Sequence, residues 1–494
     1  MKRLLIGALM LCVSLQFTGA QLPWSQRMAN SVMLSNPTTY GSSLGWNYVN
    51  GVVMSGFQAL YKKTNNVTYL NYIQATVKAQ MSGFSTYTKT LDNVKEGTAV
   101  LFMYQNTTSS TDKTSYQTKA ASIRTLLGTT SAGISRTSEG GFWHKDPSYP
   151  WQMWGDGLYM AEPFYAQYSV LFNSSATADF DDIANQFILF ETHTRDAKTG
   201  LLYHGWSEQP LNSLSTAWAD PVTGHSKSFW GRAMGWYIMG LVDVLDYMPA
   251  NHPKRPALIA ILQRLVPALI AVQDPTSGCW YDVVDQGTRC SSITPANCNY
   301  LESSASCMIT YSILKAVRLG YVNSSYLAAG KKAYEGLINT FVTTNGDAVT
   351  INNNCQVGGL GGSANRDGSF DYYMSEPIVS SDVDGKPIGP FILASLEYEA
   401  LPVVTAIKEN ENNNFQVSCL TNKNIEVSFS IQVPQKVSIS ILDIKGRTVR
   451  QLLLEKMMGG TYKELFSLED LRSGIYIVQY SSENEELSKK ISLH

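Results

Sequence analysis

The chain has 494 residues, of which 44% are hydrophobic and 16% are charged, a composition typical of a folded globular protein. Its formal net charge of −2 and the lack of a basic run give it no electrostatic field for binding nucleic acid or an anionic membrane surface. At this length we expect one large domain and one smaller domain.

The beginning of the chain predicts an export signal. Lys2 and Arg3 precede an apolar run, Leu4–Phe17, and the small residues of Thr18–Ala20 offer a cleavage site. The apolar run is too short to span a bilayer, and no other stretch of the sequence reaches the required length. We therefore expect residues 1–20 to be a cleaved signal peptide and the mature protein to have no transmembrane segment.

Residues 21–403 show helical periodicity interrupted by glycine-, asparagine- and aromatic-rich loops. Val49, Val53 and Phe57, for example, share one helical face. Helices are expected near 23–35, 49–60, 69–77, 92–105, 112–127, 157–172, 178–194, 229–247, 254–273, 303–319, 325–342 and 388–401. About twelve helices in consecutive hairpins predict an all-α fold, an (α/α)6 barrel with six inner and six outer helices.

The composition changes after the helical region. Residues 404–422 include the run ENENNNFQ and predict a polar linker. Beyond it, Val437, Ile439 and Ile441 alternate with polar residues, which is typical of a strand. Residues 423–494 therefore predict a small β-sandwich domain.

Three segments of this second domain carry a resemblance. They are VSISILDIKGRTVRQL at 437–452, LRSGIYIVQY at 471–480 and SKKISLH at 488–494. Together they resemble the sorting domain of the type IX secretion system. The resemblance implies that the secretion machinery is a partner and that the protein reaches the cell surface or the medium. A carbohydrate-binding sandwich is the alternative.

The cysteines bear on the compartment and on metal binding. Six follow the signal peptide: Cys279, Cys290, Cys298, Cys307, Cys355 and Cys419. An exported protein can form disulfides, and Cys290 with Cys298 is the best local candidate. The sequence has no CxxC pair and no histidine-rich cluster that would indicate a metal site.

The segment richest in candidate functional residues is GGFWHKDPSYPWQMWGDGLYMAEPFYAQY at 140–168. Asp156 lies where a loop meets an apolar helical run, a position at which aspartate commonly caps a helix. The same loop carries His144, Lys145 and Trp154, and loops of this kind commonly carry function. Asp156 is therefore either a helix cap or the ionisable group of a site.

This segment and six others carry a second resemblance. The others are WNYVNG at 46–51, LDNVKEG at 91–97, YHGWSE at 203–208, WGRAMGWY at 230–237, ESSASCM at 302–308 and RDGSFDYYMSEPIVSSDVDGKPIGPF at 366–391. They resemble the signature of glycoside hydrolase family 105, which is related to family 88, over essentially all of the helical region. The resemblance implies an (α/α)6 barrel that hydrolyses unsaturated uronyl glycosides with no metal or other cofactor.

The family's reaction assigns roles to two carboxylates. A carboxylic acid protonates C4 of a 4,5-unsaturated uronide, and an activated water adds at C5 to give a hemiketal that expels the aglycone, unlike direct glycoside cleavage. By motif position, Asp156 is the general acid/base. Asp92, in LDNVKEG, is the second catalytic candidate, and two close carboxylates would raise the pKa of one of them.

Because the substrate is an anion, donor and stacking groups are also needed. His204 and Arg232 are the candidates for binding its carboxylate. Trp154 and Trp236 are candidates for stacking on the sugar ring, and Arg232 and Trp236 share a helical face. Further binding candidates are Tyr48, His144 and Lys145. For each residue a structural role is the alternative: a hydrogen-bonded core histidine, a solvated lysine or a buried tryptophan.

The predicted function is removal of an unsaturated galacturonyl residue from the non-reducing end of rhamnogalacturonan oligosaccharides that lyases leave during pectin degradation. A glucuronyl hydrolase acting on ulvan or glycosaminoglycan fragments is the first alternative. An inactive, surface-displayed glycan-binding protein is the second, and a polysaccharide lyase is disfavoured. Residues 366–390 predict a long loop at the barrel mouth.

Overall fold

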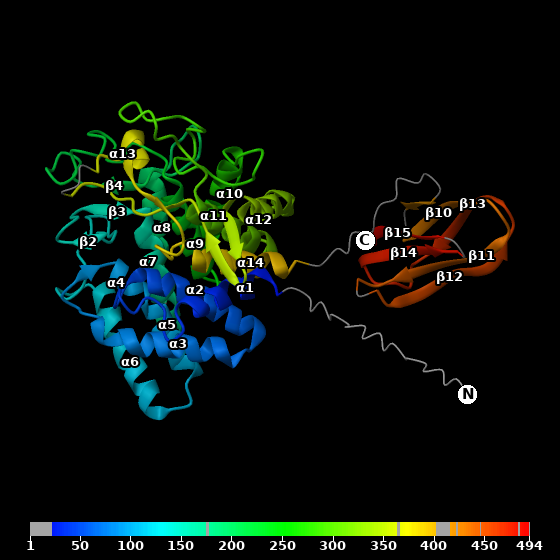
Figure 1. The fold of residues 1–494 in the computed structure, drawn as a ribbon, viewed down its shortest axis with the longest axis horizontal. Helices are drawn as coiled ribbons and strands as arrows, with labels where there is room; N and C mark the ends of the chain where they lie inside the picture. The colour runs from blue at the N-terminus through cyan, green and yellow to red at the C-terminus, as the bar shows by residue number, and fades with distance from the viewer. Residues whose placement is uncertain are drawn as a thin grey trace, which may run out of the picture. The chain divides into compact units, whose positions relative to one another are not determined.

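The computed structural model divides the chain into two compact units, residues 1–401 and residues 402–494 (Figure 1). It describes residues 22–173, 177–362, 366–401, 415–420, 423–444, 446–482 and 485–493. The expected signal peptide at 1–20 lies outside the described residues. The two units are considered separately below.

Six helices of the first unit form a closed ring, in which each packs against the next and the last returns to the first. In ring order they are α2 (Tyr48–Thr64), α5 (Gly97–Asn106), α7 (Gly155–Phe172), α9 (Gly231–Val244), α11 (Ser303–Arg318) and α14 (Ile388–Glu399). Six more helices pack outside this ring. They are α1 (Trp24–Ser35), α3 (Val67–Gln80), α6 (Ser110–Arg124), α8 (Thr177–Thr194), α10 (Arg255–Ala271) and α12 (Leu327–Phe341). The prediction of a helical first domain is confirmed.

The two sets of helices differ in how much of their surface is buried. In α9, every residue except Asp243 is buried, because neighbours cover the helix on several sides. In α6, by contrast, only Tyr116, Ala120 and Ile123 are buried, a spacing of four and three that marks one face. None of the helices in the described part of the chain is long and apolar enough to cross a membrane.

Glycines allow the ring helices to approach one another closely. A Cβ atom on Gly389 of α14 would overlap the backbone carbonyl oxygen of Val52 in α2. A Cβ atom on Gly240 of α9 would lie 2.9 Å from the carbonyl oxygen of Leu158 in α7. At both places a backbone atom, which cannot move aside alone, fills the space of a side chain.

We expect Gly389→Ala to lower the free energy of unfolding by about 2 to 3 kcal/mol, because the added methyl group forces α14 away from α2. Denaturant unfolding of the purified variant measures this loss. Gly330→Ala in α12 is the matched control, since its methyl group would meet only side-chain atoms of Leu314 and Ile313, which can shift. An equal loss in both variants would contradict this account of ring closure.

Short elements connect the ring helices. They are α4 (Asp92–Lys95), α13 (Phe370–Ser375), β1 (Lys89–Thr90), β2 (Lys145–Asp146), β3 (Gln152–Trp154), β4 (Gly205–Ser207), β5 (Val342–Asn345), β6 (Ala348–Ile351), β7 (Asn354–Cys355) and β8 (Ile378–Val379). The helix expected at 92–105 is divided at Glu96, whose carboxylate accepts a hydrogen bond from the Asn47 backbone (2.9 Å). The segment 366–390 is not the continuous loop that was expected, because α13 and β8 lie within it.

The second unit consists of two antiparallel sheets around one apolar core. The strands are β9 (Phe415–Cys419), β10 (Asn424–Ile431), β11 (Gln435–Leu442), β12 (Thr448–Met457), β13 (Gly460–Ser467), β14 (Gly474–Ser481) and β15 (Glu486–Leu493). Their order is β13-β10-β9 in one sheet and β12-β11-β14-β15 in the other. Ile425, Val427 and Phe429 alternate with polar residues and enter the core.

Two expectations about smaller features have different outcomes. The linker predicted at 404–422 is wrong for its later part, because Phe415–Cys419 forms β9 and pairs with β10. Phe415 and Val417 alternate with polar residues, which is a strand pattern, but the asparagines before them led to the prediction of a linker. The disulfide between Cys290 and Cys298 is confirmed.

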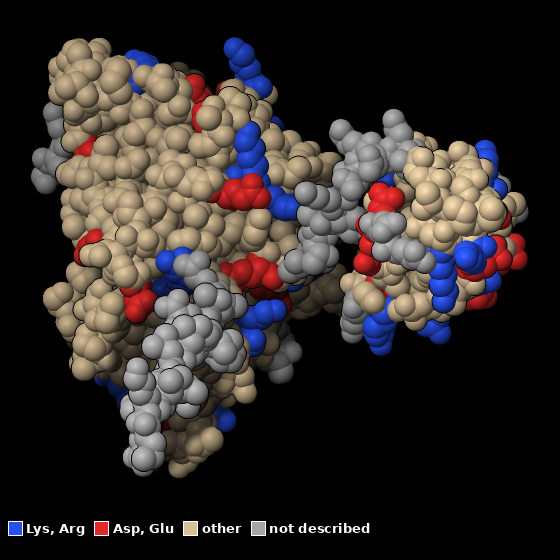
Figure 2. All heavy atoms as spheres, turned by 45° about the vertical axis from the view of Figure 1, so that its right-hand side comes forward, with Lys and Arg blue, Asp and Glu red and all other residues tan. Residues whose placement is uncertain are grey.

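Charged side chains do not form a dominant patch on the face of the molecule that Figure 2 shows. Lys and Arg lie interspersed with Asp and Glu on both units, and uncharged residues cover most of that surface. This distribution agrees with the nearly neutral net charge. A site for a charged ligand on this face would therefore depend on a few local groups rather than on a broad charged surface.

Candidate active site

The predicted polar residues gather at the N-terminal ends of the ring helices. Tyr48 is the first residue of α2, Asp156 is the second of α7 and Arg232 is the second of α9. Arg232 also contacts Ser304, the second residue of α11 (3.4 Å). Helix N-termini carry partial positive charge, so this end of the ring is suited to an anion.

A two-strand ladder brings Asp156 to His204. In the ladder of β3 with β4, Trp154 pairs with Gly205, and the Gly155 backbone donates a hydrogen bond to the His204 carbonyl (3.0 Å). The Asp156 carboxylate then lies 3.2 Å from His204 Nε2. Asp156 is not a helix cap: Trp154 occupies the N-cap position of α7, and the Asp156 carboxylate faces the histidine instead.

His204 is held on its other sides by aromatic residues. Its Nδ1 lies 2.7 Å from the Tyr373 hydroxyl, and its ring lies 4.6 Å from that of Trp230, between centroids. Trp230 in turn donates to Asp282 (2.9 Å), whose pKa is raised to about 8 by burial and, less strongly, by Glu302. A Tyr373 hydroxyl that donates to Nδ1 leaves the proton on Nε2, where it faces Asp156.

The electrostatics of Asp156 differ from our expectation. Burial alone would raise its pKa, but His204, followed by His144 and Arg232, lowers it further than burial raises it. The net result is a pKa below the ordinary value of 3.8. The expected elevation of a pKa is therefore wrong for Asp156 in this state, because the surrounding positive and donor groups outweigh burial.

A second ladder brings Asp92 to His144. Thr90 of β1 pairs with Lys145 of β2, and the Leu91 backbone donates to the His144 carbonyl (3.1 Å). His144 Nε2 lies 3.9 Å from the Asp92 carboxylate. Burial lowers the pKa of His144, so its ring is neutral at physiological pH. The side chain of Asp92 is 34% exposed, compared with 15% for Asp156.

Arg232 is buried and anchored to a loop backbone. Its Nη1 donates to the Cys355 carbonyl and to Asn354 (3.3 Å), while Glu302 accepts from the Cys355 backbone (3.0 Å). Burial tends to lower the pKa of Arg232, but its neighbours, including Glu302, raise it well above its ordinary value. Nη2 has no hydrogen-bond partner among the described residues. This buried donor remains available to a ligand.

Two residues that the sequence did not single out, Lys386 and Asp384, join this group. Lys386 is paired with Asp384, donates to the Gln356 carbonyl (2.9 Å) and lies 5.7 Å from the ring centroid of Tyr48. Burial, with Asp92 second, raises the pKa of Tyr48 well above its ordinary value, and Arg232 opposes this. Tyr48 therefore lies within the field of the same charged groups. The polar, glycine-rich character of 366–390 was the available signal for Lys386, although it did not single out a residue.

The two tryptophans proposed as stacking walls are not exposed for that role. Trp236 is 1% exposed and stacks on Tyr159 in the main core (5.2 Å between centroids). Trp154 is 5% exposed, because His144 stacks on it (4.3 Å) and Tyr149 covers it as well (4.7 Å). We therefore correct both assignments: Trp236 is a core residue, and Trp154 supports His144.

Aromatic rings with more exposure remain near the site. Tyr48 and Tyr149 are both half-buried, and Tyr149 was visible in the sequence as a ring between two prolines. Lys145 is half-buried on β2 and forms no ion pair with any residue that the structure describes. The structure thus brings together Tyr48, Asp92, His144, Asp156, His204 and Arg232, and leaves Trp236 outside.

Comparisons with known proteins agree with this organisation. Residues 24–401 match the Glycosyl Hydrolase Family 88 profile, and residues 421–494 match the profile of the Secretion system C-terminal sorting domain. A solved family 105 glycoside hydrolase from C. acetobutylicum ATCC 824 is 40% identical, with a TM-score of 0.69, and the match covers 77% of this chain and 100% of that chain.

Two curated relatives are also similar. The 24.9 kDa protein in the picA locus of Rhizobium radiobacter is 35% identical over 44% of this chain and 89% of its own. The unsaturated rhamnogalacturonyl hydrolase YesR of Bacillus subtilis is 26% identical over 59% of this chain and 77% of its own. The chain therefore belongs to glycosyl hydrolase family 88, is an enzyme of the family 88/105 type and ends in a secretion sorting domain.

The contact with His204 makes a testable prediction about Asp156. We expect the Asp156 carboxyl to titrate below 3.8 in the wild-type protein and at a higher pH in His204→Gln, which removes the main group opposing burial. Carboxyl ¹³C NMR measures both titrations, and the resonance that is missing in Asp156→Asn identifies the residue. A wild-type pKa at or above the ordinary value would contradict the electrostatic account.

Proposed function

We propose that the protein removes a 4,5-unsaturated galacturonyl residue from the non-reducing end of rhamnogalacturonan oligosaccharides that lyases leave during pectin degradation. The activity of an unsaturated glycuronyl hydrolase follows from the family, and the galacturonyl substrate follows the name of the Bacillus subtilis relative. The observation that carries the proposal is the contact of Asp156 with His204 beside a buried arginine that has an unpaired donor.

We also propose that the helical unit is an (α/α)6 barrel of six hairpins and that the second unit is a β-sandwich. The closed ring of six helices and the six helices outside it support the first proposal. Two sheets around one core support the second. The catalytic groups then lie at the end of the barrel where the inner helices begin.

Asp156 is the proposed acid/base. Its proton passes to C4 of the unsaturated ring, and the resulting carboxylate, or the carboxylate of Asp92, removes a proton from the water that adds at C5. His204 Nε2 orients the Asp156 carboxylate and stabilises its charged form. The hemiketal at C5 then opens and releases the aglycone, so no residue needs to attack the anomeric carbon.

The low pKa of Asp156 in the free protein is compatible with an acid role once substrate is bound. The substrate contributes a carboxylate, and its entry excludes water from a site that is already mostly buried. Both effects raise the pKa of a neighbouring carboxyl group. In this account Asp156 takes up a proton as substrate binds, and Arg232 Nη2 and Lys386 receive the substrate carboxylate.

Two alternatives remain within the same site. Unsaturated glucuronyl ends of ulvan or glycosaminoglycan fragments would undergo the same chemistry, since only the aglycone differs. An inactive glycan-binding protein would need aromatic platforms but no acid. The burial of Trp154 and Trp236 counts against the binding protein, because neither indole offers an open face.

For localisation, we propose export through the type IX secretion system to the cell surface or the medium. The match of residues 421–494 to a secretion sorting domain supports this proposal. A substrate that is an extracellular polysaccharide fragment agrees with it. The secretion machinery is then a partner of the second unit, and the oligosaccharide is a partner of the first.

Asp156→Asn tests the acid/base assignment. We expect it to lower kcat by roughly 100-fold to 10,000-fold, because the amide cannot donate or accept the catalytic proton, while the melting temperature and substrate affinity change little. Asp347→Asn, the same replacement in an exposed turn, is the matched control and should keep wild-type activity. Wild-type turnover by Asp156→Asn would exclude Asp156 as the acid/base.

The substrate is tested by following the ultraviolet absorbance of the 4,5-double bond. We expect a steady fall with an unsaturated galacturonyl–rhamnose disaccharide and a rate at least about tenfold lower with unsaturated glucuronyl disaccharides. A faster fall with the glucuronyl substrates would support the first alternative instead. No fall with any of them would leave the glycan-binding protein as the better account.

A further inference from the structure

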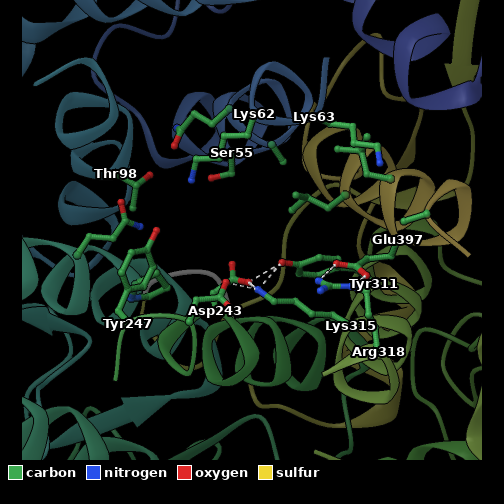
Figure 3. A pocket seen from close by; sticks show the side chains of 18 of the residues that line it. Ser55, Lys62, Lys63, Thr98, Asp243, Tyr247, Tyr311, Lys315, Arg318 and Glu397 are labelled. Atoms are coloured by element: carbon green, nitrogen blue, oxygen red, sulfur yellow. Dashed lines mark hydrogen bonds and ion pairs between the residues drawn. The ribbon is translucent and has the colours of Figure 1, made fainter. Parts of the chain in front are cut away.

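A cavity of about 470 Å³ lies at the other end of the helical ring from Asp156. It is lined by Lys62 near the end of α2, Gln167 in the second half of α7 and Lys315 near the end of α11, together with Lys95 and Thr98 on either side of the start of the shorter helix α5. The proposed active site lies where α2, α7 and α11 begin. Figure 3 shows the labelled side chains around an open centre. A volume of this size accommodates a monosaccharide.

Most charged groups of the cavity are already paired. Lys315 contacts Asp243 (2.8 Å) and Asp246 (2.6 Å), and Arg318 pairs with Glu397 (2.6 Å). Figure 3 shows the contacts of Lys315 and Arg318 as dashed lines. In these pairs three carboxylates share two cations, and the remaining lysines of the cavity have no carboxylate in direct contact.

Three lysines that line the cavity have no ion pair with the described residues: Lys62, Lys63 and Lys95. Lys62 and Lys63 are exposed. Lys95 is 1% exposed, and its ammonium lies 3.8 Å from the centroid of the Tyr159 ring. Burying an ammonium group without a counter-charge is unfavourable, and one aromatic ring compensates for only part of it.

The titration of Lys95 agrees with this geometry. Burial lowers its pKa to about 7, although the charge of Asp243 opposes the shift. Neutral hydrogen-bonding groups complete the lining, among them Ser55, Thr98 and Tyr247. The cavity thus combines hydroxyl groups with a buried amine that a bound anion would hold in its charged form, and together these suit a small, polyhydroxylated anion.

We propose that this cavity is a second binding site, separate from the proposed active site, for a small organic anion of the sugar-acid class. The anion's carboxylate pairs with Lys95, with Lys62 and Lys63 at the exposed side, and its hydroxyl groups bond to the serine, threonine and tyrosine side chains. The proposal does not depend on the substrate at Asp156.

Isothermal titration calorimetry with D-galacturonate tests the proposal, with neutral D-galactose and inorganic phosphate as further probes. Because galacturonate can also enter the active site, the binding is located with matched variants. We expect Lys95→Met and Lys62→Met each to weaken one galacturonate-binding event by at least about tenfold. Arg232→Met, which removes a cation at the active-site end, should leave that event unchanged.

Galactose and phosphate show whether the cavity recognises the charge of galacturonate or only the shape of its sugar ring. Weaker binding of galactose than of galacturonate supports the anion site, and competition by phosphate that is lost in Lys95→Met supports it as well. Folding of each variant is checked by its melting temperature, and Lys62→Met is exposed enough to fold if Lys95→Met does not. The proposal would be overturned if both lysine variants bound galacturonate as the wild-type protein does. It would also be overturned if the wild-type protein showed a single galacturonate-binding event and Arg232→Met abolished it.

Discussion

Two short antiparallel ladders position each catalytic carboxylate of the proposed site beside a histidine. The ladder of β3 with β4 places Asp156 next to His204, and that of β1 with β2 places Asp92 next to His144. The ladders in turn precede helices whose starts are fixed by packing in the ring. The site therefore depends on ring closure, for which α14 must approach α2 closely at Gly389.

The charged groups of the site are mostly buried, but not all of their hydrogen-bonding atoms have partners among the described residues. Asp156 keeps its charge in a mostly buried position because His204, His144 and Arg232 together outweigh burial. Arg232 is held by the Cys355 carbonyl and by the side-chain oxygens of Asn354 and Ser304, and it retains one unpaired donor. Such groups destabilise the empty site and favour a bound anion, a balance that is common where a protein recognises a charged ligand.

The helical part of the fold was predictable because it rests on periodicity. The apolar spacing in α2 and α6 is visible in the sequence, and so is the strand alternation around Val437. The ladders were not predictable, since strands of two or three residues such as Lys145–Asp146 have no measurable period. The break at Glu96 and the helix α13 were missed as well, because a one-residue interruption and a six-residue helix are too short to change the periodicity of the sequence.

The candidate site was predictable in part. Motif resemblance singled out Asp92, Asp156, His204 and Arg232, and these lie at one end of the ring. It could not distinguish an exposed tryptophan from a buried one, because burial depends on neighbours distant in sequence, such as His144 on Trp154. Tyr373, in the short helix α13, and Lys386, in the loop before α14, are likewise brought in by a segment whose path no local pattern encodes.

The central claim is that this site hydrates a double bond rather than attacking an anomeric carbon. The most direct measurement is NMR of the product formed by the wild-type protein in D2O from an unsaturated galacturonyl–rhamnose disaccharide. The account predicts deuterium at C4 of the uronic acid product, since the proton that Asp156 delivers comes from solvent. Release of rhamnose with no deuterium at C4 and with the double bond intact would contradict it.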